Sequence, residues 1–393
     1  MKKLAALFLA LAMTVALAAC GNSAAPGSSA PENDTAPTSS EGSGANDAAF
    51  STEDGEAQPA AEGDFTPIDC DPLEISFSTT YNQTETGGQV IQQWIDYLAE
   101  YSNGNITVDP YWGGTLYGDV DVLDGLSSGA INMTTLGHMP HLNTLVYLNF
   151  PSFAPGGTEA ALDYFTTIMF ENEETASLVQ QEAADNGIIY LNVLPGGANV
   201  FCTTYEFTDL DSLVSNSKSF GNIDATVFEA LGFQVTAIGP ADGYDALQRG
   251  LIDSTQMGLT PLVSMQYYDI ADYWALDGTY AAGNFISANL DWWNSLSEDQ
   301  QSIIRAASDA VQAWSCAEFE DEIETGLSTI EAETGNPIVE LSDEDIDRIW
   351  AANFEAKVQS ALSIAEANGK TEGMVKILEL AAELTGYDWS YQG

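Results

Sequence analysis

The stretch Gly243–Gly258 reads GYDALQRGLIDSTQMG, and the stretch Val122–Gly137, which begins 121 positions earlier, reads VLDGLSSGAINMTTLG. Aligned without a gap, the two agree at six of sixteen positions: Asp124/Asp245, Leu126/Leu247, Gly129/Gly250, Ile131/Ile252, Thr134/Thr255 and Gly137/Gly258. In each copy we expect a short helix that ends at a glycine, which readily takes the left-handed conformation of a helix C-terminus. A short buried strand and a Thr-x-x-Gly turn follow, and open α/β sheets bind ligands at such strand ends. The pair predicts two similar α/β lobes with a cleft between them.

The N-terminus has the pattern of an export signal. Two lysines follow Met1, an apolar run covers Leu4–Leu17, and the box LAAC that ends at Cys20 is typical of lipoprotein cleavage sites. We predict a signal peptide over residues 1–19 and a lipid on the Cys20 sulfur, although an ordinary signal beside an incidental cysteine is the alternative. Residues 20–71 are mostly Ser, Ala, Gly, Pro and acids, so we expect a disordered tether with a reach of about 40 Å. The remaining chain would then lie at the outer face of the cytoplasmic membrane.

The chain is strongly acidic. Its 59 aspartates and glutamates stand against 9 lysines and arginines, which gives a formal net charge of −50. Between Leu4 and Gln248 the only lysine or arginine is Lys218. Nucleic acid and anionic lipid surfaces are therefore poor partners, since both attract basic faces and repel acidic ones.

No metal or cofactor site is expected. His138 and His141 have a spacing that can bind zinc, but no third ligand of matching character is near, and a proline between them disfavours a helix. The acidic run Asp119–Gly125 resembles a calcium loop only in its first residues. We interpret His138 as a hydrogen-bonding residue of the cleft. The cysteines Cys70, Cys202 and Cys316 are interpreted as packing residues, with one disulfide left open.

The apolar spacing predicts the main elements of two lobes. We expect strands at Leu73–Ser78 and Ile106–Tyr111 and helices at Gly88–Ser102, Leu162–Asn186, Ser297–Thr325 and onward from Ser342. Two long extended stretches, residues 188–201 and 280–290, would connect the lobes as a hinge. The expected architecture is a two-lobed α/β fold like that of periplasmic binding proteins. Lobe 1 would comprise residues 72–195 and 283–330, and lobe 2 residues 196–282 and 331–393 with helices that brace both lobes.

The motifs of common enzymes are missing from the sequence: there is no Gly-x-Ser-x-Gly elbow, phosphate-binding glycine loop or metal triad. The stretch Tyr244–Asp253, YDALQRGLID, resembles the signature of the solute-binding subunit of TRAP (tripartite ATP-independent periplasmic) transporters. Four further stretches are similar to this family in the expected order: Tyr101–Val108, Gly113–Leu116, Leu123–Met133 and Phe228–Gly232. The resemblance implies an extracytoplasmic receptor, not an enzyme, that closes on a small solute and docks on a permease driven by an ion gradient.

The sequence departs from the family where the solute would bind. Family members usually carry an arginine that grips a substrate carboxylate, but this chain has Lys218 and Ser219 at that place and Asn199 where a second arginine is common. In one hypothesis Lys218 binds an organic acid, as a point charge without the arginine's fork. In the other the solute is neutral or zwitterionic and is held by aromatic and amide side chains. The predicted ligand-binding residues are Tyr81, Asn82, Trp112, His138, Asn199, Lys218, Ser219, Asn222, Gln256 and Met257.

Two other classes of protein remain possible from the sequence. A receptor of the same shape could serve an ATP-driven importer, and its neighbouring genes would then encode an ATPase. A surface enzyme such as a glycoside hydrolase would use a pair of carboxylates, but acids are so numerous that the sequence does not single out any pair. We interpret the chain as a receptor for a small organic acid.

Overall fold

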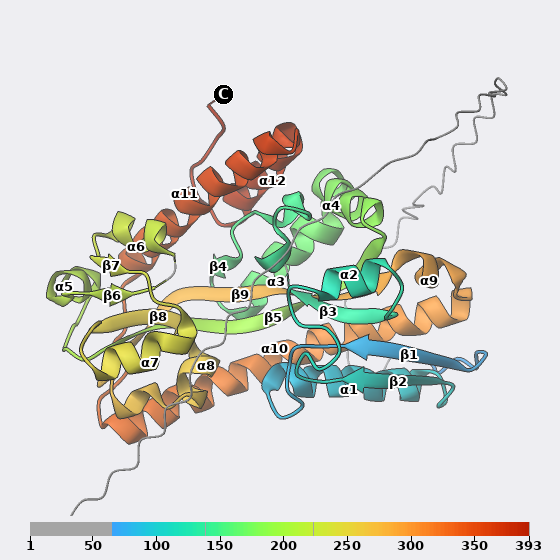
Figure 1. The fold of residues 1–393 in the computed structure, drawn as a ribbon, viewed down its shortest axis with the longest axis horizontal. Coiled ribbons are helices and arrows are strands. Elements are labelled where there is room, and N and C mark those ends of the chain that lie inside the picture. The colour runs from blue at the N-terminus through green and yellow to red at the C-terminus, as the bar shows by residue number, and fades with distance from the viewer. Residues whose placement is uncertain (1–64, 138, 223, 393) are drawn as a thin grey trace, which may run out of the picture. The chain divides into compact units, whose positions relative to one another are not determined.

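The computed structural model describes residues 65–392 except 138 and 223. Within these residues a nine-stranded sheet has the order β2-β1-β3-β9-β5-β8-β6-β7, with β4 paired to β9 (Figure 1). The strands are β1 (Leu73–Ser78), β2 (Ile106–Tyr111), β3 (Met133–Gly137), β4 (Phe153–Pro155), β5 (Ile188–Thr203), β6 (Phe220–Gly221), β7 (Val235–Thr236), β8 (Ser254–Gly258) and β9 (Tyr273–Asn289). Both expected short strands, β1 and β2, are confirmed with the predicted bounds.

The sheet has the same arrangement on both sides of its central pair. β5 and β9 are antiparallel and 16 and 17 residues long, and they run through both halves. On one side β3 is antiparallel to β9 and parallel to β1, which is parallel to β2. On the other side β8 is antiparallel to β5 and parallel to β6, which is parallel to β7. The predicted extended stretches are therefore confirmed as the two strands that join the halves.

The two sequence repeats fold alike. In the first, α2 (Val122–Ser127) precedes β3, and in the second α7 (Pro240–Gln248) precedes β8. Gly129 and Gly250 follow the helices with positive φ values of 73° and 69°, as predicted from the glycine pattern. Their backbone hydrogen bonds are displaced by the same 121 residues: Gly125 O accepts from two amides after the first helix and Ala246 O from two amides after the second. The predicted Thr-x-x-Gly turns are wrong, because Thr134–Gly137 and Thr255–Gly258 lie within β3 and β8. Their backbones pair with β9 and β5 as far as the glycine, so the strands continue through these residues.

The threonine shared by the repeats explains part of this likeness. Thr134 donates its hydroxyl hydrogen to Ser78 O at 2.7 Å, and Thr255 donates to Gly221 O at 2.6 Å. In both cases the accepting carbonyl belongs to the parallel neighbour strand, β1 or β6. A threonine at the same position of each repeat thus links the equivalent pair of parallel strands, β3 to β1 in one half and β8 to β6 in the other.

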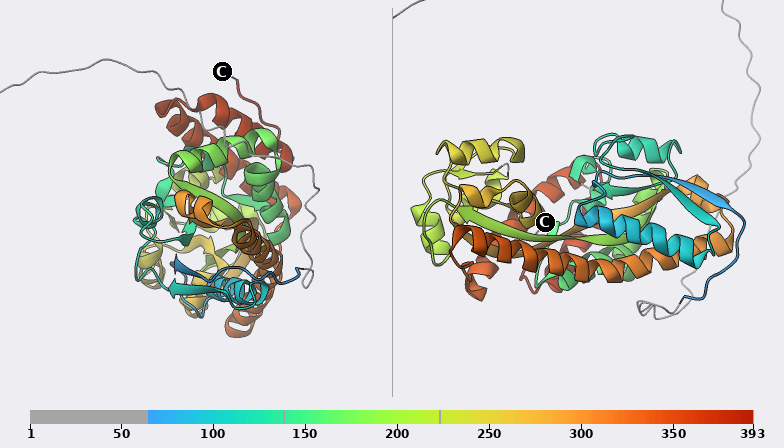
Figure 2. Two further views of the ribbon diagram at one scale, coloured as in Figure 1. Left: turned by 90° about the vertical axis from the view of Figure 1, so that its right-hand side faces the viewer. Right: turned by 90° about the horizontal axis from the view of Figure 1, so that it is seen from below.

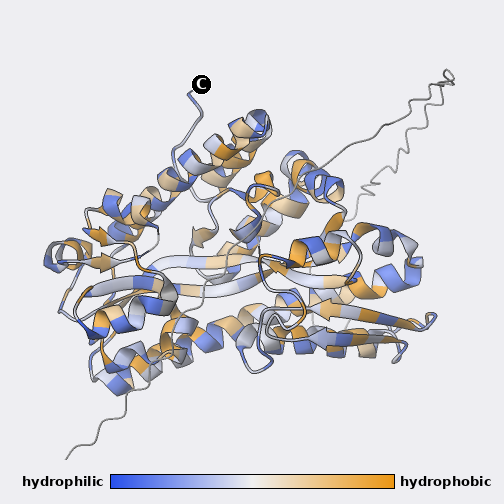
Figure 3. Ribbon diagram, viewed as in Figure 1, coloured by the Kyte–Doolittle hydropathy of each residue, from blue (hydrophilic) through white to orange (hydrophobic). Residues whose placement is uncertain are grey.

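Helices cover both faces of the sheet. They are α1 (Thr86–Tyr101), α3 (Thr158–Thr166), α4 (Glu173–Asp185), α5 (Leu210–Asn216), α6 (Ala225–Leu231), α8 (Leu259–Ser264), α9 (Leu290–Ser295), α10 (Glu298–Thr334), α11 (Asp343–Ala367) and α12 (Thr371–Leu384), with short helices η1 (Met139–His141), η2 (Val146–Leu148), η3 (Thr167–Glu171) and η4 (Tyr267–Asp269). Polar and apolar residues are mixed along these helices, as expected where one face is buried (Figure 3). None of the described helices combines the length and apolar character needed to cross a bilayer.

One helix belongs to both halves. The 37 residues of α10 lie along the sheet and pack on α1 at one end and on α8 at the other (Figure 2). The predicted capping box at its start is confirmed, because Ser297 accepts from the Gln300 amide and Gln300 accepts from the Ser297 amide. The helix after Ser342 is confirmed as α11, and residues 298–384 are mostly helical, as expected.

The prediction of one continuous helix over Leu162–Asn186 is wrong. The stretch Leu162–Asn186 is not one helix but α3, the π-helical turn η3 and α4. The break lies at Asn172, whose φ and ψ are extended and whose side-chain oxygen accepts from the amides of Glu174 and Thr175. An asparagine side chain competes with the helical backbone in this way and starts a new helix.

Candidate solute-binding cleft

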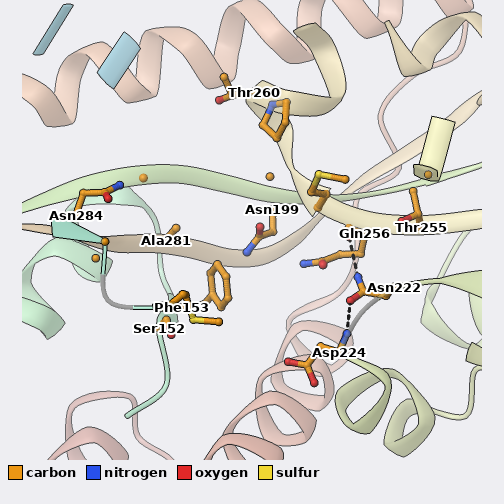
Figure 4. Close-up of a pocket in the computed structure, with 18 of the residues that line it drawn as sticks. Ser152, Phe153, Asn199, Asn222, Asp224, Thr255, Gln256, Thr260, Ala281 and Asn284 are labelled. Atoms are coloured by element: carbon orange, nitrogen blue, oxygen red, sulfur yellow. Dashed lines mark hydrogen bonds between the residues drawn. The ribbon is translucent and has the colours of Figure 1, made fainter. Parts of the chain in front are cut away.

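A cavity of about 1000 Å³ lies between the two halves of the sheet. Strands of both repeats line it: Gly137 at the end of β3, and Thr255, Gln256 and Gly258 of β8. The crossing strands supply its floor, and α10 supplies Phe319 and Glu322. The predicted common cleft is thus present, with walls from the duplicated units (Figure 4).

The floor of the cleft is an irregular part of the central strand pair. Ala198 lies opposite Tyr280 and Val200 opposite Leu276, so Asn199 alone faces the three residues Asp277–Gly278–Thr279. Such a bulge bends a strand and redirects its side chains. Gly278 is required there: its φ is +77°, and a Cβ would approach Ile346 to 2.5 Å.

The bulge buries a carboxylate under the cleft. Asp277 is 1 % exposed. Its Oδ1 accepts from the Thr279 amide at 2.7 Å and from the Thr279 hydroxyl at 2.8 Å, while its Oδ2 accepts from Gln256 Nε2 at 2.6 Å. Thr279 Oγ1 in turn accepts from Asn199 Nδ2 at 3.1 Å. Burial raises the pKa of Asp277 to about 6, although these hydrogen bonds act to lower it. We call these four residues the Asp277 relay.

Carboxylates dominate the charge of the cleft. Glu85, Asp119, Asp224 and Glu322 line it. The only basic side chain among its described lining residues is Lys357 from α11, which forms an ion pair with Asp224 at 2.6 Å. Glu322 Oε2 is buried without a hydrogen-bond partner among the residues described, and burial raises the pKa of this carboxyl group.

Tyr81 lies at the acidic end of the cleft. Its hydroxyl oxygen accepts from Asn284 Nδ2. Burial raises its pKa above the ordinary value, and the nearby charges of Asp119, Glu85 and Glu322 raise it further. The hydroxyl therefore stays protonated and is surrounded by negative charge.

Five of the predicted ligand-binding residues line the cleft: Tyr81, Asn199, Asn222, Gln256 and Met257. Asn222 donates to Gln256 O at 2.9 Å and accepts from the Asp224 amide at 2.8 Å (Figure 4). Other predicted residues are not among the lining residues. The Asn82 side chain donates to Glu85, and Trp112 packs on the apolar cluster around α1. His138 and Cys20 lie outside the described residues.

Lys218 and Ser219 lie beside the cleft rather than in its lining. Lys218 is exposed, and its amide donates to Asp253 Oδ2 at 2.9 Å. The Ser219 hydroxyl lies 2.7 Å from that of Thr236. The cation that does line the cleft, Lys357, was not found from the sequence, because nothing local connects α11 with a site 133 residues earlier. The Asp277–Gly278 pair was a detectable signal, since Asp-Gly commonly marks turns and bulges.

Within the described residues, no group of three or more His, Cys, Asp or Glu side chains is arranged to hold a metal ion. Cys70, Cys202 and Cys316 are free, and Cys202 is fully buried in an apolar cluster. The packing role expected for Cys202 agrees with this position.

Comparison with known proteins shows the family. Residues 77–362 match the model described as DctP, bacterial extracellular solute-binding protein, family 7. The chain belongs to this family. Its members are solute receptors of TRAP transporters rather than enzymes, and they act outside the cytoplasm.

Individual relatives are distant but cover most of the chain. The chain is 23% identical over 281 residues to the ectoine/5-hydroxyectoine-binding periplasmic protein UehA of Ruegeria pomeroyi, covering 70% of this chain and 81% of the relative. It is 22% identical over 245 residues to the C4-dicarboxylate-binding periplasmic protein DctP of Rhodobacter capsulatus, covering 59% and 70%. The solved sugar acid binding protein DctPAm of Advenella mimigardefordensis, in complex with galactonate, has a TM-score of 0.60 at 19% identity and covers 80% of this chain and all of its own. The likeness to this solved structure confirms the two-lobed α/β fold predicted from the repeat.

Proposed function

We propose that this family-7 receptor captures a small organic solute carrying a carboxylate, by closing its two lobes, and delivers it to an ion-gradient-driven TRAP permease. The observation that carries the proposal is the cleft of about 1000 Å³ whose walls come from both repeats. Cavities of this size suit small molecules. The three register irregularities of the β5–β9 pair between Leu194 and Val200 support a hinge there, because closure needs only a few residues to change conformation.

The anchor proposed for the carboxylate is Lys357 rather than Lys218. Lys357 lines the cleft and is partly buried, and its present partner Asp224 is also in the lining. A solute carboxylate could share the ammonium group, which has three donors. Relatives named for C4-dicarboxylates and complexes with sugar acids agree with an acidic solute.

The proposal also includes how the receptor is attached to the membrane and where its two lobes begin and end. A lipid on Cys20 would hold the receptor at the outer face of the membrane, and residues 20–71 would let the lobes reach the permease. Lobe 1 would comprise residues 72–195 and 283–330, and lobe 2 residues 196–282 and 331–393.

The test is a thermal-shift screen of carboxylates against the parent, Lys357→Ala and Lys218→Ala, with native mass spectrometry of any solute that co-purifies. We expect a carboxylate to raise the melting temperature of the parent and of Lys218→Ala but not of Lys357→Ala. If a carboxylate stabilises all three proteins equally, neither lysine anchors it. If only neutral solutes bind, or zwitterions whose binding does not depend on Lys357, the alternative favoured by the cleft's four carboxylates replaces the acidic solute.

A further inference from the structure

The Asp277 relay has only one arrangement of its hydrogen atoms when the carboxylate is ionised. An ionised carboxylate accepts hydrogen bonds and donates none. Gln256 must therefore present its NH₂ group to Asp277, at 2.6 Å. The Thr279 hydroxyl likewise gives its only hydrogen to Asp277, at 2.8 Å. Thr279 Oγ1 is then an acceptor toward Asn199, which must also present its NH₂ group, at 3.1 Å.

This arrangement decides what the cleft offers to a solute. Because one hydrogen of each NH₂ group, on Gln256 and on Asn199, bonds inside the protein, the opposite side of each amide, with its oxygen Oε1 or Oδ1, is free to accept from a solute. Neither oxygen has a hydrogen-bond partner among the described residues, and neither is among the fully buried atoms that lack one. Both side chains line the cavity (Figure 4). The floor of the cleft thus offers these two acceptor oxygens to a solute.

We infer that Asp277 is a specificity-determining residue, which orients Gln256 and Asn199 so that the receptor selects solutes carrying a hydroxyl or ammonium hydrogen-bond donor. This inference rests on the proposed function, since it assigns to the captured solute a hydrogen-bond donor in addition to its carboxylate. A carboxylate at Lys357 and a donor at Gln256 together describe a hydroxy acid or an amino acid. A plain oxo acid would place its carbonyl oxygen against two acceptor oxygens and leave all of them unsatisfied.

The substitution Asp277→Asn reverses one half of the relay while retaining its shape. The side-chain oxygen of the variant still accepts from the Thr279 amide and hydroxyl, but the new NH₂ group faces Gln256. Gln256 then turns its oxygen inward and its NH₂ group to the cleft, whereas Asn199 keeps its orientation. The variant has nearly the same volume and no buried charge, so we expect it to fold.

The test uses matched acids that differ only at carbon 2: pyruvate, L-lactate and L-alanine, with the corresponding four-carbon series oxaloacetate, L-malate and L-aspartate. In calorimetric titrations the parent should prefer the hydroxy or amino member of a series over the oxo member by about fivefold, the size of one hydrogen bond. Asp277→Asn should lose or reverse this preference. Asp272→Asn removes an exposed aspartate just before β9 and should behave as the parent does. The hydroxy and amino members separate the two kinds of donor.

A second measurement needs no solute. The Gln256 side-chain amide hydrogens, assigned by NMR through their loss in Gln256→Ala, should be protected from exchange in the parent and exposed in Asp277→Asn. Equal exchange in both proteins, or an unchanged preference against the oxo acid in Asp277→Asn, would overturn the inference. If neither these acids nor any carboxylate of the thermal-shift screen binds the parent, the proposed function fails, while the exchange data still decide whether Asp277 orients Gln256.

Discussion

Burying Asp277 costs the native protein stability above neutral pH, and the substitution Asp277→Asn should recover it. The folded state raises the pKa of this carboxyl group from the usual 3.8 to about 6. The folded protein holds the proton of Asp277 more tightly than the unfolded chain does. Protonation of this group therefore stabilises the folded state fully below about pH 4, and that stabilisation is lost as the pH rises through 6. The difference between 3.8 and about 6 corresponds to about 3 kcal/mol in the free energy of unfolding.

The assay is urea unfolding of the parent, Asp277→Asn and Asp272→Asn at pH 4 and pH 8. We expect the stability of Asp277→Asn relative to the parent to be higher at pH 8 than at pH 4 by about 3 kcal/mol. Asp272→Asn removes the same charge from an exposed position and controls for the protein's overall acidity. A difference between Asp277→Asn and the parent that is the same at both pH values would refute the reasoning, because the carboxyl group would then titrate alike in both states.

Two further predictions concern stability. Lys370→Met leaves Glu182, whose side chain is 2 % exposed, without its cation and should cost about 3 kcal/mol in urea unfolding, whereas Lys376→Met removes an exposed pair and should cost less than about 1 kcal/mol. Equal losses would show that the Lys370 pair is not effectively buried. Thr134→Val and Thr255→Val each remove one buried hydrogen bond between parallel strands and should cost about 1 kcal/mol by the same measurement. A large loss in only one of them would contradict the structural equivalence of the repeats.

The features predicted well from sequence are those fixed by neighbouring residues. Gly129 and Gly250 end their helices because a positive φ favours glycine, and this preference does not depend on the rest of the fold. Ser297 and Gln300 form a capping box within one turn. The repeat then implied the cleft, because two like units whose strand ends face a ligand produce one where they meet.

The site itself was only half predictable. Tyr81 follows the end of β1, Asn199 belongs to the long strand β5 and Gln256 to the short strand β8, and all three line the cleft. Lys218 attracted attention as the lone cation of its half, but the fold brings Lys357 into the cleft from a helix far along the chain. Convergence of that kind depends on tertiary packing, which spacing along a single sequence does not encode.

The continuous helix α10 has a mechanical consequence for a receptor that opens and shuts. Its 37 residues extend about 55 Å, and Phe319 near its middle packs on Gly197 in the irregular part of β5. A rod shared by both lobes must flex or slip whenever they approach each other. Closure as proposed above would thus be coupled to the packing of α10 on α1 and α8.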